Sequence, residues 1–256
     1  MIRENKVKKI LKNGGTVLGT FMKLNDPLSI EVLGLAGLDF VIIDNEHVSM
    51  SKESMVGLIR GADVVGIVPV VRVRENNPVE ILQALDAGAL GVQIPNVDKL
   101  EDAVIAARSM KYYPKGNRGF SPGNRSAAYG FMDKKEYVKM ANDNTLAVFH
   151  CESATCMKNL DEILREEELD VIFIGPEDLS QSLGVIGEQT HPKLLEAIDS
   201  IIKKVRASGK AVGMVAGNVE KARELMAKGV QYLAISTDQG MIASMAKQYV
   251  KELKQA

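Results

Sequence analysis

Cysteine is scarce in this sequence, and neither sign of charge is in excess. The two cysteines, Cys151 and Cys156, cannot complete a Cys-rich zinc site and are predicted to be reduced thiols in the interior. Lys and Arg number 32 against 33 Asp and Glu, and they form no stripe of the kind that a nucleic-acid backbone requires. Nucleic acid is therefore not expected as a partner.

Long apolar runs are also missing. No run approaches the roughly 20 residues that a helix needs to cross a bilayer. The N-terminus, with its basic segment from Lys6 to Lys12, lacks the continuous apolar stretch of a signal peptide. A membrane partner is therefore not expected, and the protein is predicted to be cytoplasmic. The composition, 46% hydrophobic and 25% charged, is typical of a globular protein.

Short β-branched runs alternate with amphipathic stretches along the whole chain, which is the pattern of repeated β/α units. The predicted strands are Thr16 to Met22, Phe40 to Asp44, Val68 to Val73, Gly91 to Ile94, Leu146 to Glu152, Val171 to Ile174, Ala211 to Val215 and Tyr232 to Ser236. Helices are predicted after each strand. Asp26-Pro27 and Asn77-Pro78 each supply a capping side chain and then a proline for the first helical position.

These units predict the fold class. A chain of 256 residues has the usual size of a (β/α)8 TIM barrel, so residues 1–256 are expected to form a single domain. Strands that are apolar throughout, such as 171–174, suit a parallel sheet that is covered on both faces. A doubly wound open sheet is the alternative.

Residues 111–144 interrupt this rhythm, because they are more than a connection between a helix and the next strand needs. The segment contains Pro114, Gly116, Gly119, Pro122, Gly123 and Gly130, together with Arg118 and Arg125. Loops this long in a compact domain are usually functional or disordered. An active-site lid or an oligomer interface is predicted here, and a solvated insertion is the alternative.

Polar residues follow several of the predicted strands at the ends that form the active site of such barrels. They are Asp44 to His47, Arg72, His150, Glu152, Glu177 and Asp178. An arginine at the end of an apolar strand needs an anion, and its planar fork matches a carboxylate. Glu152 and Asp178 follow neighbouring strands, about 4.8 Å apart, so they could together bind Mg²⁺ or Mn²⁺.

The histidines allow more than one interpretation. His47 lies in a polar loop, where it is either a catalytic base or an incidental exposed residue. His150 shares a strand face with Glu152, and it is either a metal ligand, a substrate contact or a buried histidine whose hydrogen bonds are satisfied. His191 precedes a proline at a helix start, where a structural role is expected.

Several segments together resemble the HpcH/HpaI aldolase family, in the right order and over nearly the whole chain. They are Gly19-Thr20-Phe21 with Asp26-Pro27, Ile43-Asp44-Asn45-Glu46-His47, Pro69-Val70-Val71-Arg72, Leu85-Asp86-Ala87-Gly88-Ala89, Glu152-Ser153 and Phe173-Ile174-Gly175-Pro176-Glu177-Asp178-Leu179-Ser180. The resemblance implies a metal-dependent class II aldolase that reversibly cleaves 4-hydroxy-2-oxo acids, including 2-keto-3-deoxy sugar acids, to pyruvate and an aldehyde.

The resemblance also implies roles for individual residues. His47 would accept the proton, and Asp86, from the same or a neighbouring subunit, would raise its basicity. Arg72 would stabilise the enolate oxygen. Glu152 and Asp178 would bind Mg²⁺, Mn²⁺ or Co²⁺, and the backbone at Glu177 would contact the 2-oxo acid.

The family often has glutamine where this chain has His150, which leaves the substrate contact there open. A homo-oligomer, a trimer of dimers, is implied as well.

Two other functions fit parts of the pattern. An acyl-CoA lyase would need a basic groove for the CoA phosphates, for which Arg118 and Arg125 are the candidates. A barrel that only binds a metal and an oxo acid would not need His47 as a base, so the combination of His47, Arg72 and the two carboxylates favours the aldolase.

Overall fold

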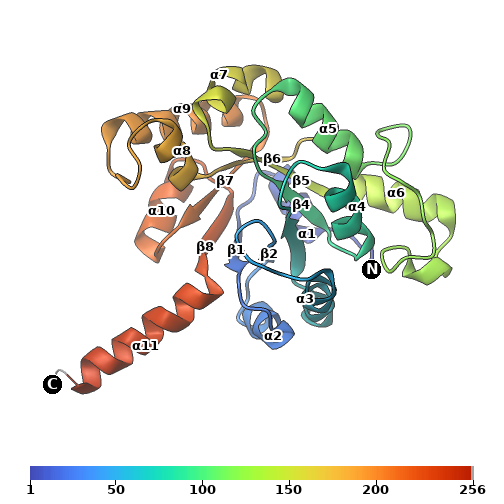
Figure 1. Cartoon of the computed structure of the whole chain (residues 1–256), viewed down its shortest axis with the longest axis horizontal. Helices are drawn as coiled ribbons and strands as arrows, with labels where there is room; N and C mark the ends of the chain where they lie inside the picture. The colour runs from blue at the N-terminus through green and yellow to red at the C-terminus, as the bar shows by residue number, and fades with distance from the viewer. Residues whose placement is uncertain (255–256) are drawn as a thin grey trace.

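Parallel strands pair in chain order and close into a barrel, because β1 and β8 also pair (Figure 1). The computed structural model describes residues 1–254. The strands are β1 (Val17–Met22), β2 (Phe40–Asp44), β3 (Val68–Arg72), β4 (Gly91–Ile94), β5 (Leu146–Cys151), β6 (Val171–Ile174), β7 (Ala211–Ala216) and β8 (Tyr232–Thr237). The predicted (β/α)8 TIM barrel is confirmed and the open sheet is wrong. Residues 255 and 256 of the predicted domain lie outside the described range.

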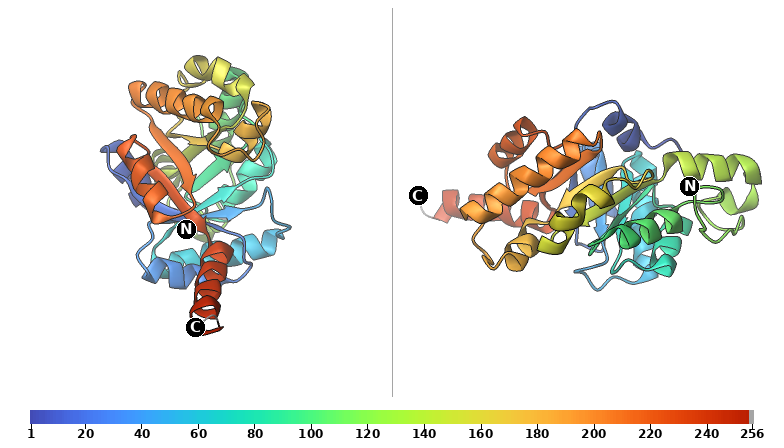
Figure 2. Two further views of the ribbon diagram at one scale, coloured as in Figure 1. Left: turned by 90° about the vertical axis from the view of Figure 1, so that its left-hand side faces the viewer. Right: turned by 90° about the horizontal axis from the view of Figure 1, so that it is seen from above.

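Helices follow the strands and surround most of the barrel (Figure 2). They are α1 (Lys6–Lys12), α2 (Pro27–Leu35), α3 (Lys52–Val65), α4 (Pro78–Asp86), α5 (Leu100–Met110), the 3₁₀ turn η1 (Ala128–Gly130), α6 (Lys134–Asn144), α7 (Ala154–Ile163), α8 (Pro176–Ser182), α9 (Pro192–Ala207), α10 (Val219–Ala227) and α11 (Asp238–Lys254). The predicted caps form: Asp26 accepts from the Leu28 N–H at 3.0 Å, and Asn77 accepts from the Val79 N–H at 2.8 Å.

The core has two shells, as the alternation of side chains along each strand requires. One shell fills the barrel interior and includes Phe40, Val70, Val148 and Tyr232. The other lies between the strands and the surrounding helices. Inside the barrel, the Phe40 and Tyr232 rings stack at a centroid distance of 4.0 Å. A Cβ at position 19 would lie 2.5 Å from the Phe40 ring, so glycine is required there.

Helix α11 departs from the barrel instead of covering it (Figures 1 and 2). Its start is fixed by Asp238, which is buried and accepts the backbone N–H groups of Lys23 and Leu24. Beyond that turn the helix projects away, and Ile242, Tyr249 and Leu253 are 60%, 57% and 82% exposed. Among the described residues, no helix is both long enough and apolar enough to cross a membrane.

The segment 111–144 lies at the N-terminal end of the barrel. Arg118 pairs with Asp86, Arg125 pairs with Asp63, and Lys111 pairs with Glu168. Asp63 and Asp86 lie in the last turns of α3 and α4, and Glu168 precedes β6, so all three lie at the N-terminal end of the barrel. The prediction that the segment is a lid over its own active site is therefore wrong, because the active-site end is opposite. An oligomer interface stays a prediction.

Candidate active site

Arg72 ends β3 inside the mouth of the barrel and is held there by carboxylates. Its Nε and Nη2 donate to Oδ1 and Oδ2 of Asp44 at 2.9 and 2.7 Å, and its Nη1 lies 2.9 Å from Glu46 Oε2. Its guanidinium carbon lies 4.9 Å from the centroid of the Phe21 ring. The anion predicted for the fork of Arg72 is thus Asp44, and only the remaining N–H groups of Arg72 can reach a substrate oxygen.

Asp44 was predicted only as part of a polar strand end, yet it organises this side of the site. It lies opposite Arg72 in the β2–β3 register and is fully buried. Burial raises the pKa of Asp44, but the hydrogen bonds and charge of Arg72 outweigh that effect and hold its pKa below the usual range. Its Oδ1 also accepts the backbone N–H groups of Glu46 and His47 at 3.2 and 3.3 Å, which fixes the loop that carries the candidate base.

His47 follows β2 and faces an open pocket. Its side chain is 54% exposed, and its Nε2 lies 3.7 Å from Glu46 Oε2. The pocket has a volume of about 590 Å³, and its lining includes His47, Ser49, Ser51 and Arg74. Burial raises the pKa of Glu46 although Arg72 opposes this. Glu46, which the sequence indicated only as part of a polar strand end, lies between the candidate base and Arg72, because its Oε2 approaches both side chains.

Glu152 lies just beyond the end of β5, is 7% exposed, and has both carboxylate oxygens engaged. Oε1 accepts the Asn96 backbone N–H at 2.9 Å, and Oε2 lies 2.5 Å from His150 Nδ1. Burial raises the pKa of Glu152, but the His150 ring and the Asn96 N–H lower it below the usual value. The carboxylate is therefore ionised at neutral pH, as a ligand for a hard cation must be.

His150 points into the barrel, and neither ring nitrogen is free. Nε2 lies 2.7 Å from Nε2 of Gln93, and Nδ1 contacts Glu152. The ring also stacks on Phe173, with centroids 5.2 Å apart. A direct contact with substrate or metal, as predicted from the sequence, would require one of these hydrogen bonds to break. The third sequence interpretation, a buried histidine with satisfied hydrogen bonds, is the one that the structure shows.

Glu177 and Asp178 lie in the first turn of α8 and are exposed. Gly175, which follows β6 and precedes α8, brings this turn against Glu152: a Cβ at position 175 would lie 2.8 Å from Glu152 Oε2. Asp178 forms no salt bridge with any residue of the range 1–254. The carboxylate of Asp178, three residues after Gly175, is therefore left unpaired in the described part of the chain.

These carboxylates fit a hard divalent cation. No group of three or more His, Cys, Asp or Glu side chains within residues 1–254 forms a complete metal cage. A cation at Glu152 and Asp178 would need water or substrate oxygens for its other positions, which is usual for Mg²⁺. Because Gly175 has no side chain, a cation can approach Oε2 of Glu152 from that side.

Asp86 is not brought to this site by its own chain. It ends α4, and the backbone N–H of Leu90 just beyond it donates to the carbonyl of Pro69 at the start of β3, so Asp86 lies at the N-terminal end of the barrel. Its Oδ1 lies 2.6 Å from Nη2 of Arg118. A role beside His47 within one subunit is therefore wrong, because the two residues lie at opposite ends of the barrel. Only the neighbouring-subunit form of the prediction stays open.

The chain is similar to known proteins along nearly its whole length. A model of the HpcH/HpaI aldolase/citrate lyase family matches residues 18–244. The chain is 34% identical to a 2-dehydro-3,6-dideoxy-6-sulfogluconate aldolase of Pseudomonas putida, covering 96% of this chain and 95% of the relative. It is 33% identical to a 5-keto-4-deoxy-D-glucarate aldolase of Escherichia coli K12, covering 98% and 97%.

A solved structure gives the same result for the fold. The crystal structure of an HpcH/HpaI aldolase/citrate lyase family protein from Burkholderia cenocepacia J2315 superposes with a TM-score of 0.93 at 28% identity, covering 98% of this chain and 99% of the other. The resemblance seen in the sequence motifs is thereby confirmed, and with it the expectation of a carbon–carbon lyase. The chain belongs to the HpcH/HpaI aldolase/citrate lyase family.

Proposed function

We propose that this chain is a divalent-metal-dependent class II aldolase that reversibly cleaves 4-hydroxy-2-oxo acids to pyruvate and an aldehyde. The observation that carries the proposal is the division of the barrel mouth into two charged sides. Glu152 stands ionised beside Gly175 and the Asp178 turn on one side. Arg72, fixed by Asp44 and Glu46, stands on the other with His47 in the adjoining loop.

Each side has a separate part in the chemistry. A divalent cation, Mg²⁺, Mn²⁺ or Co²⁺, held by Glu152 and Asp178 would polarise the carboxylate and oxo oxygens of the substrate. Arg72 stabilises the negative charge that develops on the 2-oxo oxygen, and the backbone N–H of Glu177 orients the substrate carboxylate. Because Arg72 is already oriented by Asp44, it needs no rearrangement during the reaction.

His47 moves the proton in the bond-breaking step. It accepts the proton of the C4 hydroxyl, the electrons of that O–H bond form the aldehyde C=O, and the C3–C4 bond breaks. The electrons of the C3–C4 bond then form the enolate of pyruvate. The enolate takes a proton from solvent at C3 to give pyruvate, and His47 returns its proton to solvent. The half-exposed position of His47 beside the open pocket lets the aldehyde leave from that side.

Within one subunit, the acyl-CoA alternative loses its structural basis. Arg118 and Arg125, the candidates for binding the CoA phosphates, pair with Asp86 and Asp63 at 2.6 Å each. Both pairs lie at the end of the barrel opposite to Glu152. The two arginines that this alternative requires therefore supply no basic groove at the mouth of their own barrel.

Removal of the metal tests the proposal. Chelation followed by buffer exchange is expected to lower aldol cleavage about a thousandfold, since metal polarisation contributes several kcal/mol and each 1.4 kcal/mol is tenfold in rate. Adding Mg²⁺, Mn²⁺ or Co²⁺ to the same sample should restore the rate. Full turnover in a sample that elemental analysis shows to be free of metal would refute the proposal.

We also propose that a second copy of this chain covers α11 and the adjoining face of α2. The two helices line an apolar groove of about 660 Å³ that includes Leu28, Val32, Ile242 and Tyr249. An eighth helix normally covers the barrel wall beside the first strand, but here that helix projects away (Figure 1). Because the same patch is present on each copy, two copies can cover each other around a two-fold axis.

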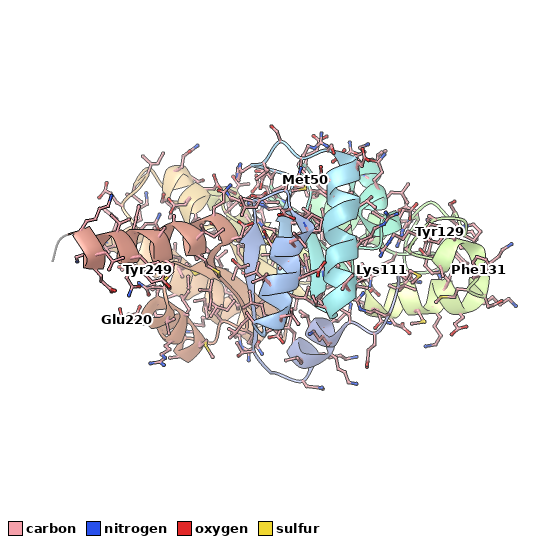
Figure 3. All side chains as sticks on the ribbon, turned by 90° about the horizontal axis from the view of Figure 1, so that it is seen from below. Met50, Lys111, Tyr129, Phe131, Glu220 and Tyr249 are labelled. Atoms are coloured by element: carbon pink, nitrogen blue, oxygen red, sulfur yellow. The ribbon has the colours of Figure 1, made fainter. Side chains whose placement is uncertain are left out.

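A trimer of dimers needs a second contact. The exposed Tyr129 and Phe131 on the 111–144 segment lie at the end of the molecule opposite to Tyr249 (Figure 3). The same segment donates the Ser126 N–H to the Asp86 carbonyl. An interface through this segment would also be the way in which Asp86 could serve a neighbouring His47.

Polar substitution on α11 tests the dimer. The double variant Ile242→Lys, Met245→Lys is expected to run as a smaller species than the wild type in light scattering, because it places charges in the groove. Gln248→Lys is the matched control, since Gln248 lies on α11 outside the groove lining. An unchanged mass for the double variant, or an equal loss in both proteins, would contradict this contact.

A further inference from the structure

Gln93 is a buried polar residue that neither the sequence motifs nor the proposed mechanism uses. It lies on β4 between Val92 and Ile94, opposite Arg72 in the β3–β4 register. Its side chain points into the barrel interior and is fully buried. Its Oε1 has no hydrogen-bond partner among the described residues. An unpaired buried amide oxygen is unfavourable, so packing alone would be better served by methionine at this position.

The partnered atom of Gln93 explains why an amide stands here. Its Nε2 lies 2.7 Å from Nε2 of His150. An amide nitrogen can only donate, so the imidazole Nε2 must accept, and the ring proton then resides on Nδ1. Nδ1–H donates to Glu152 Oε2 at 2.5 Å. Gln93 therefore selects the tautomer through which His150 holds the carboxylate.

The rest of the surroundings fix the carboxylate in place. Phe173 stacks on the His150 ring with an interplanar angle of 25°, which limits rotation of the ring. The Asn96 N–H holds the other oxygen of Glu152 at 2.9 Å. A carboxylate oxygen that accepts one hydrogen bond still has a lone pair, so each oxygen of Glu152 can bind a cation while both hydrogen bonds persist.

We propose that Gln93 is a positioning residue that acts through His150 to orient Glu152 for a divalent cation. The inference rests on the metal site of the proposed function and adds a relay to it: Gln93 to His150 to Glu152. Partners of this kind around a metal ligand set both the tautomer and the orientation of the ligand. Gln93 itself touches neither substrate nor metal in this assignment.

The tautomer can be read in the metal-free protein. The chain has three histidines, so the ring nitrogens of His150 can be assigned by comparing ¹⁵N spectra of the wild type and the His150→Gln variant. The wild type is expected to show His150 protonated at Nδ1 and not at Nε2. Gln93→Met, which keeps the volume and removes the donor, should lose this single state. A wild-type ring protonated at Nε2, alone or together with Nδ1, would overturn the relay.

Metal affinity gives the second readout, measured by calorimetry with Mn²⁺. Gln93→Met is expected to weaken Mn²⁺ binding about 10- to 100-fold, the usual effect of losing a partner of a metal ligand. The same substitution in a His150→Gln background should change the affinity less than about threefold, because the relay is already broken. Equal losses in both backgrounds, or no loss in the first, would overturn the inference.

A matched control separates the relay from a general loss of a buried amide. Gln231 is also buried with an unpartnered Oε1, and its Nε2 donates to the Gly15 carbonyl at 3.1 Å at the far end of the barrel. Gln231→Met should leave Mn²⁺ affinity unchanged, and a loss equal to that of Gln93→Met would count against the relay. A wild type that binds no Mn²⁺ would refute the metal site and this inference together, whereas tight binding by Gln93→Met would refute the inference alone.

Discussion

Replacing Arg72 by lysine is expected to lower kcat/KM for aldol cleavage about 100- to 1000-fold, the usual effect of removing a donor to a developing oxyanion. Lysine keeps the charge, but a point ammonium cannot hold Asp44 and Glu46 together while it also donates to a substrate oxygen. In the wild type, separate guanidinium nitrogens contact these two carboxylates. The loss should therefore appear mainly in kcat, because the substitution removes a donor that Asp44 and Glu46 hold in position for the developing oxyanion.

An arginine away from the His47 pocket gives the control for this experiment. Arg223 lies on α10, outside the barrel, and is exposed. Arg223→Lys should change kcat/KM by less than a factor of about three, since it keeps the charge on a surface helix. If Arg72→Lys had a near-normal rate, Arg72 would be part of a structural ion pair with Asp44 and would have no part in the reaction.

Replacing His47 by alanine is expected to slow aldol cleavage and addition about 100- to 10,000-fold, the range for loss of a general base. These steps move a proton at the oxygen that becomes the aldehyde. Binding of pyruvate and exchange of its methyl protons with solvent should change much less, because Arg72 and the metal ligands are intact. The two rates are measured on the same protein preparation.

The comparison of the two rates also tests the assignment. Parallel loss of cleavage and exchange would show that His47 does more than serve the C4 hydroxyl. Equal cleavage rates in His47→Ala and wild type would assign the base to another group. His191 is a suitable control, because its Nδ1 has a structural role: it caps α9 by accepting from the Lys193 N–H.

Most of the barrel could be predicted because its signals are local. Proline at positions 27 and 78 marks the first residue of α2 and α4 in the structure, as predicted. Strands β2, β4 and β6 have the predicted bounds, since each is a short apolar run between turn-forming residues. The course of α11 could not be predicted in this way. Its sequence is that of an amphipathic helix whether it packs on its own barrel or on another.

The site was predicted in part, for reasons that the individual residues show. Arg72 was expected to need an anion, but the sequence did not indicate that Asp44, in register on the next strand, supplies it. Gln93 carried a signal that was overlooked: a polar residue between Val92 and Ile94 in a short buried strand must find a partner inside the barrel. The position of Asp86 at a helix end also indicated the far end of the barrel.

Exchange of pyruvate methyl protons in D₂O tests the central claim most directly, because it requires the enolate but no knowledge of the aldehyde. We expect the wild-type enzyme with Mg²⁺ or Mn²⁺ to incorporate deuterium into pyruvate, as measured by mass spectrometry. The chelated enzyme and the Glu152→Gln variant should incorporate none above the uncatalysed background, while Gln231→Met should match the wild type. No exchange by the metal-loaded wild type, or undiminished exchange by Glu152→Gln, would contradict an enolate-forming aldolase with Glu152 as a metal ligand.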